Sequence, residues 1–369
     1  MYTTAPGTSP EPPMRVVVAM SGGVDSAVAA ALLVRAGHEV IGVTLQLADL
    51  SRKGLGVSRC CSTTDVAMAG EVAAQLGIRH HVLDMERVFE ETVLKPFVES
   101  YLAGETPLPC AHCNASVKFG ELLTITSQMG AEALATGHYA RLSREGGQPV
   151  LLRGRDTSKD QSYFLFGLRR NQLSRVLFPL GDMHKHEVRA VARWLGLPNA
   201  DRHDSQEVCF VPEGGSYVQV LEKLAPDRLP GEGELVDPSG RVVGRHPGFH
   251  RFTIGQRRGI GVPDRRRLYV LEVRPSENRV VVSGREDALR RRLQLRGVNW
   301  LDGPAEGVLE AKVQIRSRHT AQPARVRLDI RGAAEVEFAE PVLAPAPGQA
   351  AVCYAGDRVL GGGWIVSAS

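Results

Sequence analysis

A hexapeptide near the start of the chain has the residue types and spacing of a phosphate-binding loop. Ser21-Gly22-Gly23-Val24-Asp25-Ser26 follows the strand-forming residues 16–19 and precedes an alanine-rich run that favours a helix. The glycines let the main chain approach a ligand, and the N–H groups at the start of a helix bind anions. Ser21 and Ser26 add hydroxyl donors, and the Asp25 carboxylate is suited to a Mg²⁺ ion bridging phosphates. The alternative is a glycine turn that only joins strand to helix.

The cysteines are the second group of reactive residues. They are Cys60, Cys61, Cys110, Cys113, Cys209 and Cys353. Because we expect a reducing cytosol, catalytic, metal-binding or buried thiols are favoured over disulfides. Cys110-Ala111-His112-Cys113 follows a proline-rich stretch, which predicts a loop with an exposed reactive group. This pair is a redox dithiol, half of a metal site or a coincidence, and His112 keeps zinc among the options. Cys209 by itself reads as a core cysteine or as a residue folded over the nucleotide edge.

Alternating strands and helices must position these groups. We predict strands at 40–47, 78–83 and 131–136 and helices at 64–76, 86–103 and 119–130, with Asp65 capping the first of these helices. This alternation predicts a parallel sheet covered on both faces, with ligands bound at the carboxyl ends of its strands. The phosphate loop, Leu45 and Gly137-His138 would then share one edge.

The pattern changes after about residue 213. Short β-like runs separated by Gly and Pro predict an all-β second half without helices, divided near 284–291. The expected runs are 233–236, 241–243, 268–274, 279–283, 310–315, 324–330, 334–338 and 350–354. We therefore expect a tail at 1–13, a nucleotide-binding α/β domain at 14–212, a central β-rich domain at 213–287 and a β-barrel at 288–369.

Composition limits the function classes. No apolar run approaches the roughly 20 residues that span a bilayer, and residues 1–13 lack the features of a targeting signal, so we expect a disordered tail on a cytoplasmic protein with no membrane partner. Residues 241–300 hold fifteen arginines, no lysine and five acidic residues, a formal charge of +10 against +4 for the whole chain. This stretch is a candidate polyanion-binding surface, and a solvated arginine-rich face is the alternative.

The hexapeptide matches neither the Walker pattern nor the dinucleotide-binding glycine pattern, and it resembles the signature of PP-loop ATP pyrophosphatases. Five further motifs follow it in one order: Cys113-Asn114 with Lys118-Phe119, then residues 135–141, 159–164, 204–210 and 253–259. With this set, the chain from about Arg15 closely resembles the family of bacterial tRNA-specific 2-thiouridylases. The end of the chain, at 348–352 and 361–363, also fits, and Cys60-Cys61 matches a family pattern without a known catalytic role.

The resemblance implies a two-step reaction. The C2 oxygen of the wobble uridine attacks the α-phosphate of ATP, pyrophosphate leaves, sulfur attacks C2 and AMP departs. The base must leave the anticodon stack to react. Implied partners are tRNAs of the Lys, Glu and Gln type and a sulfur donor protein or sulfide. The implied ATP-binding residues are Ala19, Met20, Ser21, Gly22, Gly23, Val24, Asp25, Ser26, Leu45 and Gly137. Those implied to contact tRNA or its target base are Leu108, Pro109, Cys110, Lys118, His138, Lys159, Asp160, Gln161, Arg318, His319 and Gln349.

Two routes for the sulfur follow from the resemblance. In the persulfide route, Cys209 carries the sulfur and Cys113 attacks or releases it. Many relatives have an aspartate where this chain has Cys110, so Cys110, Cys113 and Cys209 form a set of three thiolates. Three thiolates can hold a 4Fe-4S cluster with one open iron, and we favour that hypothesis here.

Two other functions remain open at this stage. A PP-loop synthetase that forms an amide on a small molecule would share the phosphate loop, but it needs neither three thiols nor a basic β-rich half. A tRNA- or nucleotide-binding protein without catalysis would release no pyrophosphate from ATP.

Overall fold

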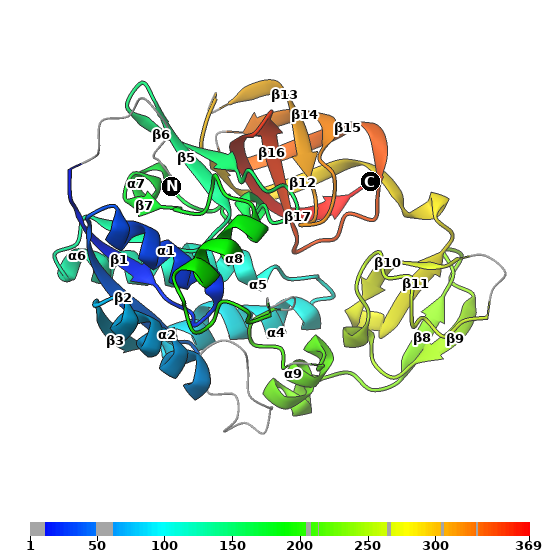
Figure 1. Cartoon of the computed structure of the whole chain (residues 1–369). Helices are drawn as coiled ribbons and strands as arrows, with labels where there is room; N and C mark the ends of the chain where they lie inside the picture. The colour runs from blue at the N-terminus through cyan, green and yellow to red at the C-terminus, as the bar shows by residue number, and fades with distance from the viewer. Residues whose placement is uncertain are drawn as a thin grey trace.

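The computed structural model describes residues 12–48, 62–203, 208–212, 214–263, 267–303, 306–329 and 331–369. Cys60, Cys61 and most of the predicted tail lie outside these ranges, as do four residues of the motif before Cys209. Figure 1 shows an α/β part, a barrel packed beside it and a small β unit set to one side. The expected fold class, a parallel α/β domain followed by two mostly-β parts that end in a barrel, is confirmed.

The α/β part is built on five parallel strands in the order β3-β2-β1-β4-β7. Their bounds are β1 Arg15–Ala19, β2 Glu39–Gln46, β3 Arg79–Asp84, β4 Ala133–Ala135 and β7 Val176–Leu177. Val16 and Val18 face one core and Val17 faces the other, as the two-residue period of a strand requires. The first core contains α1 (Val24–Arg35), α2 (Thr63–Gln75) and α8 (Lys185–Trp194), so helices cover both faces of the sheet.

The opposite face is covered by two long helical runs that contain π-helical turns. One comprises α3 (Glu86–Phe89), a π segment at Glu90–Leu94 and α4 (Lys95–Leu102). The other comprises α5 (Pro109–His112), a π segment at Cys113–Glu121 and α6 (Leu122–Gln128). The prediction that Cys110 and Cys113 lie on an exposed loop is wrong, because the helix already begins at Pro109. Proline suits that position since the first helical N–H groups have no partner within the helix.

Two further expectations need correction. The cap of α2 is Ser62, whose hydroxyl accepts from the Asp65 N–H, and Asp65 itself is buried in the first turn. The prediction that no helix follows residue 213 is also wrong, because α9 (Tyr217–Leu224) follows it. Ser216 and Gln219 form a capping box there, and Val220 and Leu221 pack into the core of the α/β part.

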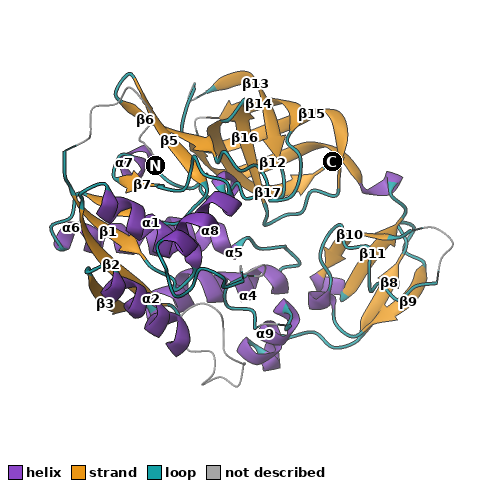
Figure 2. Ribbon diagram, in the orientation of Figure 1, coloured by secondary structure: helices purple, strands orange, loops and turns teal. Residues whose placement is uncertain are grey.

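The small β unit is a four-stranded sheet in the order β10-β11-β8-β9. Its strands are β8 Gly233–Val236, β9 Val242–His246, β10 Tyr269–Arg274 and β11 Arg279–Ser283. Figure 2 shows this sheet separated from the barrel strands, with α9 between it and the α/β part.

The barrel is closed by six strands in the order β12-β15-β14-β13-β16-β17, because β12 also pairs with β17. These are β12 Leu289–Trp300, β13 Gly307–Gln314, β14 Gln322–Asp329, β15 Ala333–Leu343, β16 Ala350–Ala355 and β17 Arg358–Ala368. A hairpin from the first half, β5 (Ala140–Glu145) and β6 (Gln148–Arg153), extends the same sheet beyond β17. The short helix α7 (Arg170–Leu173) follows this hairpin.

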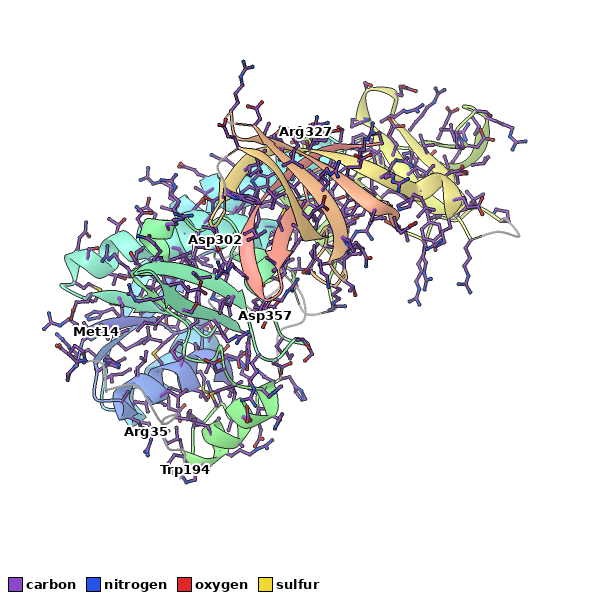
Figure 3. The ribbon with its side chains drawn as sticks, turned by 90° about the horizontal axis from the view of Figure 1, so that it is seen from above. Met14, Arg35, Trp194, Asp302, Arg327 and Asp357 are labelled. Carbon is purple, nitrogen blue, oxygen red and sulfur yellow. The ribbon has the colours of Figure 1, made fainter. Side chains whose placement is uncertain are left out.

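Figure 3 labels Arg327 on the barrel and Arg35 and Trp194 at the opposite end of the view. In this view the barrel residue and the two residues of α1 and α8 thus lie far apart. None of the helices within the described ranges is long and apolar enough to cross a membrane.

Candidate active site

The predicted phosphate loop follows β1 and leads into α1. Gly22 has a φ of +74°, and a Cβ at this position would lie 2.5 Å from the Asp65 carbonyl oxygen. Only glycine fits both the left-handed backbone and this close approach. Ser26 closes the loop, because its hydroxyl donates to the Gly23 carbonyl at 3.0 Å and accepts from the Ser21 N–H at 3.1 Å.

Two side chains from about 180 positions later in the chain donate hydrogen bonds to this loop. The Asn199 amide and the Arg202 guanidinium donate to the Gly22 carbonyl at 3.0 and 3.2 Å. Arg202 also pairs with the Asp65 carboxylate, which is 2% exposed. No local pattern in the sequence marks these two partners of the loop, because they lie so far from it along the chain.

Asp25 does not stand alone at the start of α1. One of its oxygens, Oδ1, accepts from Lys185 Nζ at 2.7 Å and from the Tyr139 hydroxyl at 2.8 Å. Lys185 is the first residue of α8, and its side chain is only 11% exposed. The sequence analysis missed Lys185, although one signal was available. The phosphate loop lacks the lysine of a Walker motif, so a cation was to be sought elsewhere in the chain.

A cavity of about 230 Å³ opens where β1, β2 and β4 end. Gly137, just after β4, lies so close to α1 that a Cβ there would be 2.8 Å from the Ser26 nitrogen. This contact brings the strand ends together as predicted. The lining residues include Ala19, Met20, Ser21, Asp25, Ser26, Leu45 and Gly137 of the predicted ATP site, together with Val43, Thr44, Leu47, Lys118, Thr136, His138 and Gln161.

A second cavity of about 430 Å³ adjoins the first. Its lining includes Cys110, Cys113 and Cys209, so residues almost 100 positions apart border one space. Gly23 and Val24 line this second cavity, whereas Gly22 lines neither. The two cavities share six lining residues, namely Ser21, Asp25, Leu47, Lys118, His138 and Gln161.

The helix that carries Cys110 and Cys113 is held against the barrel. The His112 ring stacks on Trp364 of β17, with 4.3 Å between centroids and 3° between planes. Burial lowers the pKa of His112, so this stacked ring is neutral at physiological pH. Gln349 donates to the carbonyls of Thr106 and Pro107, just before the helix, both at 3.1 Å. Pro109 also lines the larger cavity, while Leu108 is buried outside it.

The turn with Lys159, Asp160 and Gln161 lies at the junction of the cavities. Lys159 lines the larger cavity and Gln161 lines both. Asp160 lines neither, because its carboxylate accepts from Arg153 at 2.7 Å and from the N–H groups of Gly154 and Ser162, each at 3.0 Å. Asp160 therefore shapes the turn that presents its two neighbours.

His138 is the shared residue whose charge is most strongly constrained. Burial, reinforced by the nearby Lys118 ammonium, holds the pKa of His138 well below its usual value. One ring nitrogen, Nδ1, lies 2.7 Å from the Thr136 hydroxyl. The imidazole is therefore neutral at physiological pH and can offer a hydrogen bond without a positive charge.

The larger cavity has side chains of the types that bind a metal centre, but they do not lie close enough together to bind one. Cysteine thiolates are the usual ligands of iron-sulfur clusters, and three cysteines face this one space. Within the described ranges, however, no three His, Cys, Asp or Glu side chains are grouped closely enough to hold a metal ion. Cluster binding would thus require the cysteines of these two segments to approach one another.

The remaining predicted RNA contacts lie on the barrel, outside both cavities. Arg318 is exposed and His319 is partly buried, in the loop between β13 and β14. Many arginines of the 241–300 stretch form ion pairs, for example Arg279 with Glu234 and Arg292 with Glu337. Among the described residues of the 241–300 stretch, six exposed arginines have no ion pair: Arg245, Arg257, Arg258, Arg267, Arg285 and Arg291, the last of which donates to main-chain carbonyls of β15.

Comparison with known proteins covers nearly the whole chain. Family models match residues 14–213, described as a tRNA methyl transferase HUP domain, residues 219–284, a tRNA methyl transferase PRC-barrel domain, and residues 290–365, an aminomethyltransferase beta-barrel domain. A tRNA-specific 2-thiouridylase MnmA from Rhodospirillum centenum is 50% identical over 96% of this chain and 92% of its own length. Its counterpart from Solibacter usitatus is 48% identical over 96% of this chain and 100% of its own length.

A solved 4-thiouridine synthetase–RNA complex with bound ATP is 18% identical over 58% of this chain and 51% of that chain, with a TM-score of 0.34. That likeness is too weak to carry an argument.

A parallel sheet with the Ser-Gly-Gly-Val-Asp-Ser loop at its central strand places the molecule among the PP-loop nucleotide-binding proteins. Sequence identity of 48–50% over nearly the full length then identifies the family within this class. The chain belongs to the tRNA-specific 2-thiouridylase family.

Proposed function

We propose that this protein uses ATP to replace the C2 oxygen of a tRNA wobble uridine with sulfur. The observation that carries the proposal is the junction of the two cavities, because a phosphate loop borders one and three cysteines border the other. Family membership supports tRNA as the substrate. A base held at the junction can be activated from one side and receive sulfur from the other without leaving the protein.

The nucleotide occupies the smaller cavity in this proposal. Its phosphates contact the N–H groups and hydroxyls of residues 21–26, and its adenosine lies toward Leu45 and Gly137. Mg²⁺ neutralises phosphate charge when bound. Asp25 would hold this ion through Oδ2, because Oδ1 already accepts two hydrogen bonds.

Adenylation begins when the uridine C2 oxygen attacks the α-phosphorus and the bond to pyrophosphate breaks. The base must lie unstacked, and the larger cavity provides a space of about 430 Å³ next to the phosphate loop. Neutral His138 and the Lys118 and Gln161 side chains border both cavities, so they can orient the base and the phosphate. The C2 oxygen leaves with AMP once sulfur has attacked C2.

Cys110, Cys113 and Cys209 supply the sulfur side. We propose that these residues hold a 4Fe-4S cluster, which would bind hydrosulfide from a sulfide source and present it for attack on C2. The other route has a persulfide on Cys209: Cys113 attacks its inner sulfur, hydrosulfide is released to attack C2, and a Cys113–Cys209 disulfide remains for an external thiol to reduce, so only two of the three cysteines are needed. The aspartate of many relatives is a cysteine at position 110, and this substitution favours the three-thiolate arrangement.

The RNA body contacts the β-rich half in the proposed complex. Arg318, His319 and the exposed arginines of residues 241–300 lie on parts of the chain outside the cavities, where phosphates can reach them. The anticodon arm of Lys, Glu or Gln tRNAs is the expected ligand, and a cytoplasmic setting supplies both tRNA and reduced thiols.

The proposal is tested by thiouridine formation on unmodified tRNA under anaerobic conditions with ATP, Mg²⁺ and sulfide. Iron-reconstituted and iron-free protein are compared, and Cys110→Ala is run alongside both. Product only from the reconstituted wild type supports the thiolase and the cluster together. Equal product from both preparations, or full activity of Cys110→Ala, would exclude the cluster and favour the persulfide route.

Absence of product from both preparations would contradict tRNA thiolation. Pyrophosphate release without RNA, driven by a small-molecule amine acceptor, would then indicate an amide-forming synthetase. Absence of pyrophosphate release under every condition would indicate a binding protein.

A further inference from the structure

Arg153 lies at the crossing of three parts of the molecule. It ends β6, in the hairpin that extends the barrel sheet, and its N–H donates to the Asp357 carbonyl in the turn before β17. Its guanidinium donates to Asp160 Oδ2 at 2.7 Å and to Gln314 Oε1 at 3.0 Å. It also lies over the Tyr354 ring, 3.5 Å from the centroid. One side chain thus links the active-site turn to two barrel strands.

Gln314 continues this link to the barrel loop. It ends β13 and is 4% exposed, and its amide nitrogen donates to the carbonyls of Arg316 and Ser317 at 2.9 and 3.0 Å. These carbonyls belong to the loop that carries Arg318 and His319. The amide of Gln314 is therefore fully used, with its oxygen toward Arg153 and its nitrogen toward the loop.

Asp160 continues the link in the other direction. Its carboxylate side chain is 7% exposed, and its other oxygen organises the turn through the N–H groups of Gly154 and Ser162. The Gln161 side chain in that turn accepts from the Tyr139 N–H at 3.0 Å, and the Tyr139 hydroxyl donates to Asp25. An unbroken series of hydrogen bonds and chain neighbours therefore joins the barrel loop to the phosphate loop.

We propose that Arg153 is a positioning residue that fixes the Lys159–Gln161 turn relative to the barrel loop at 315–321. The inference rests on the proposed function, because it assigns RNA contacts to that loop and substrate contacts to that turn. An RNA seated on the barrel then meets a turn at a set distance, and the target base enters the junction in one orientation. A planar guanidinium suits this role because it can bind two acceptors at once, which a lysine ammonium does not reproduce.

The first test measures thiouridine formation with tRNA varied and ATP saturating. We expect Arg153→Met to lower kcat/KM for tRNA about 30-fold and Arg153→Lys to restore only part of it, since the methionine can donate to neither acceptor and the lysine to only one of them. The affinity for a non-hydrolysable ATP analogue without RNA should change less than about twofold. Loss of tRNA and nucleotide functions together, with a lowered unfolding temperature, would show a general structural role and overturn the proposal.

Matched variants separate the two sides of the link. Gln314→Leu removes both the Arg153 hydrogen bond and those to the loop, whereas Gln314→Glu keeps the acceptor for Arg153 and removes only the donors to the loop. Tyr354→Phe keeps the ring beneath Arg153 and removes only the hydroxyl, 3.2 Å from the Ser162 hydroxyl. We expect kcat/KM for tRNA to fall about tenfold, threefold and less than twofold, in that order.

A double-mutant cycle decides whether these residues act through one another. If they do, Arg153→Met combined with Gln314→Leu is no worse than Arg153→Met alone. If the two effects multiply, to roughly 300-fold, Gln314 acts independently of Arg153 and the proposal fails.

Hydrogen exchange gives a readout that needs neither RNA nor turnover. In Gln314→Leu, the amides at 159–162 should exchange faster than in wild type, although residue 314 lies in the barrel. Unchanged exchange there would overturn the proposal whatever the activities show. A wild-type protein that makes no thiouridine would instead contradict the proposed function, and the exchange result would still decide the role of Arg153.

Discussion

The two adjoining cavities are built in different ways. The smaller one is formed mainly by the ends of three neighbouring parallel strands and the first turn of α1, to which Lys118 and Gln161 are added. The larger one gathers a helix with a π segment, the turn near Gln161 and the segment around Cys209, and the barrel supports the first two. The comparison teaches that the strand, loop and helix of the nucleotide side come from one continuous stretch of sequence that distant side chains only brace, whereas the sulfur side is assembled from segments far apart in the chain.

The largest effect is expected from removing a thiol, which should separate the sulfur step of the larger cavity from the nucleotide step of the smaller one. We expect Cys113→Ser to lower thiouridine formation at least about a thousandfold, because the hydroxyl is neither the thiolate nucleophile nor an iron ligand of the required kind. Release of pyrophosphate on adding ATP and tRNA should persist, since the smaller cavity is intact. The two products are measured in the same reaction, and Cys353→Ser, a change in the barrel core, is the control.

The reverse experiment alters the phosphate loop. In Gly22→Ala, a Cβ would clash with the Asp65 carbonyl, and the left-handed backbone adds strain of about 1–2 kcal/mol. We expect ATP affinity to fall about a hundredfold, with pyrophosphate and thiouridine lost together. Gly37→Ala is a matched control, because Gly37 also has a positive φ but open space at its Cβ. Normal ATP binding by Gly22→Ala would show that the loop adjusts and would weaken the contrast between the cavities.

A smaller effect is expected from removing the Lys185 ammonium, which donates to the Asp25 carboxylate. Lys185→Met removes the 2.7 Å hydrogen bond to Oδ1, which leaves the carboxylate held by Tyr139. We expect the Mg²⁺ concentration needed for half-maximal pyrophosphate release to change about tenfold, with Lys185→Arg closer to wild type. An unchanged Mg²⁺ dependence would mean that Lys185 only anchors α8. Thermal unfolding of both variants provides the control for folding.

Substitutions in the basic β-rich half should alter RNA binding but neither chemical step. We expect Arg257→Ala combined with Arg258→Ala to weaken tRNA binding a few-fold at low salt. The slope of log affinity against log salt should fall by up to about two, since each arginine neutralises at most one phosphate. Arg279→Ala removes an arginine that already pairs with glutamate and should change the slope less. A slope equal to wild type in the double variant would exclude these two arginines from the RNA surface.

The smallest effect is on pH-dependent stability. Burial lowers the pKa values of His112 and His138 in the folded chain, so the unfolded chain binds their protons first as pH falls. Stability should be fully present above the unfolded value near 6.5 and decline below it, by at most about 1.4 kcal/mol per pH unit for each histidine. His138→Gln should flatten this decline in denaturant titrations at pH 5–7. A parallel decline in wild type and variant would show that His138 takes up no proton on unfolding in this range.

The nucleotide side could be predicted because its information is local. Three β-branched residues, two glycines and a run of alanines specify the strand, loop and helix of residues 15–35 without help from distant residues. For the same reason, eight of the ten strands described after residue 230 overlap a predicted β-like run, and only β12 and β17 do not. Strand β12 was missed because its outward arginines read as a charge cluster, although buried Leu293 and Leu295 alternate with exposed residues.

The rest of the site could not be predicted because tertiary contacts create it. Lys185 meets Asp25 across 160 residues, and Arg202 meets Gly22 across 180. The start of α5 and the presence of α9 were not predicted, although each had a local signal. These signals are the proline at the first position of α5 and the capping box of α9. Asp160 was expected to contact tRNA; its carboxylate is engaged within the turn, and the RNA contact stays a prediction.

The sheet shared by the hairpin and the barrel also affects the order in which the protein can fold during synthesis. Strand β6 is synthesised about 200 residues before β17, the strand it joins, so at typical translation rates its edge waits about 10–40 s for its partner. Until then an open strand edge is available to other chains, and Arg153 gains Gln314 and Tyr354 only after about 160 and 200 further residues have been made. A nascent chain can therefore form its phosphate loop early, but its complete tRNA site only when synthesis is nearly finished.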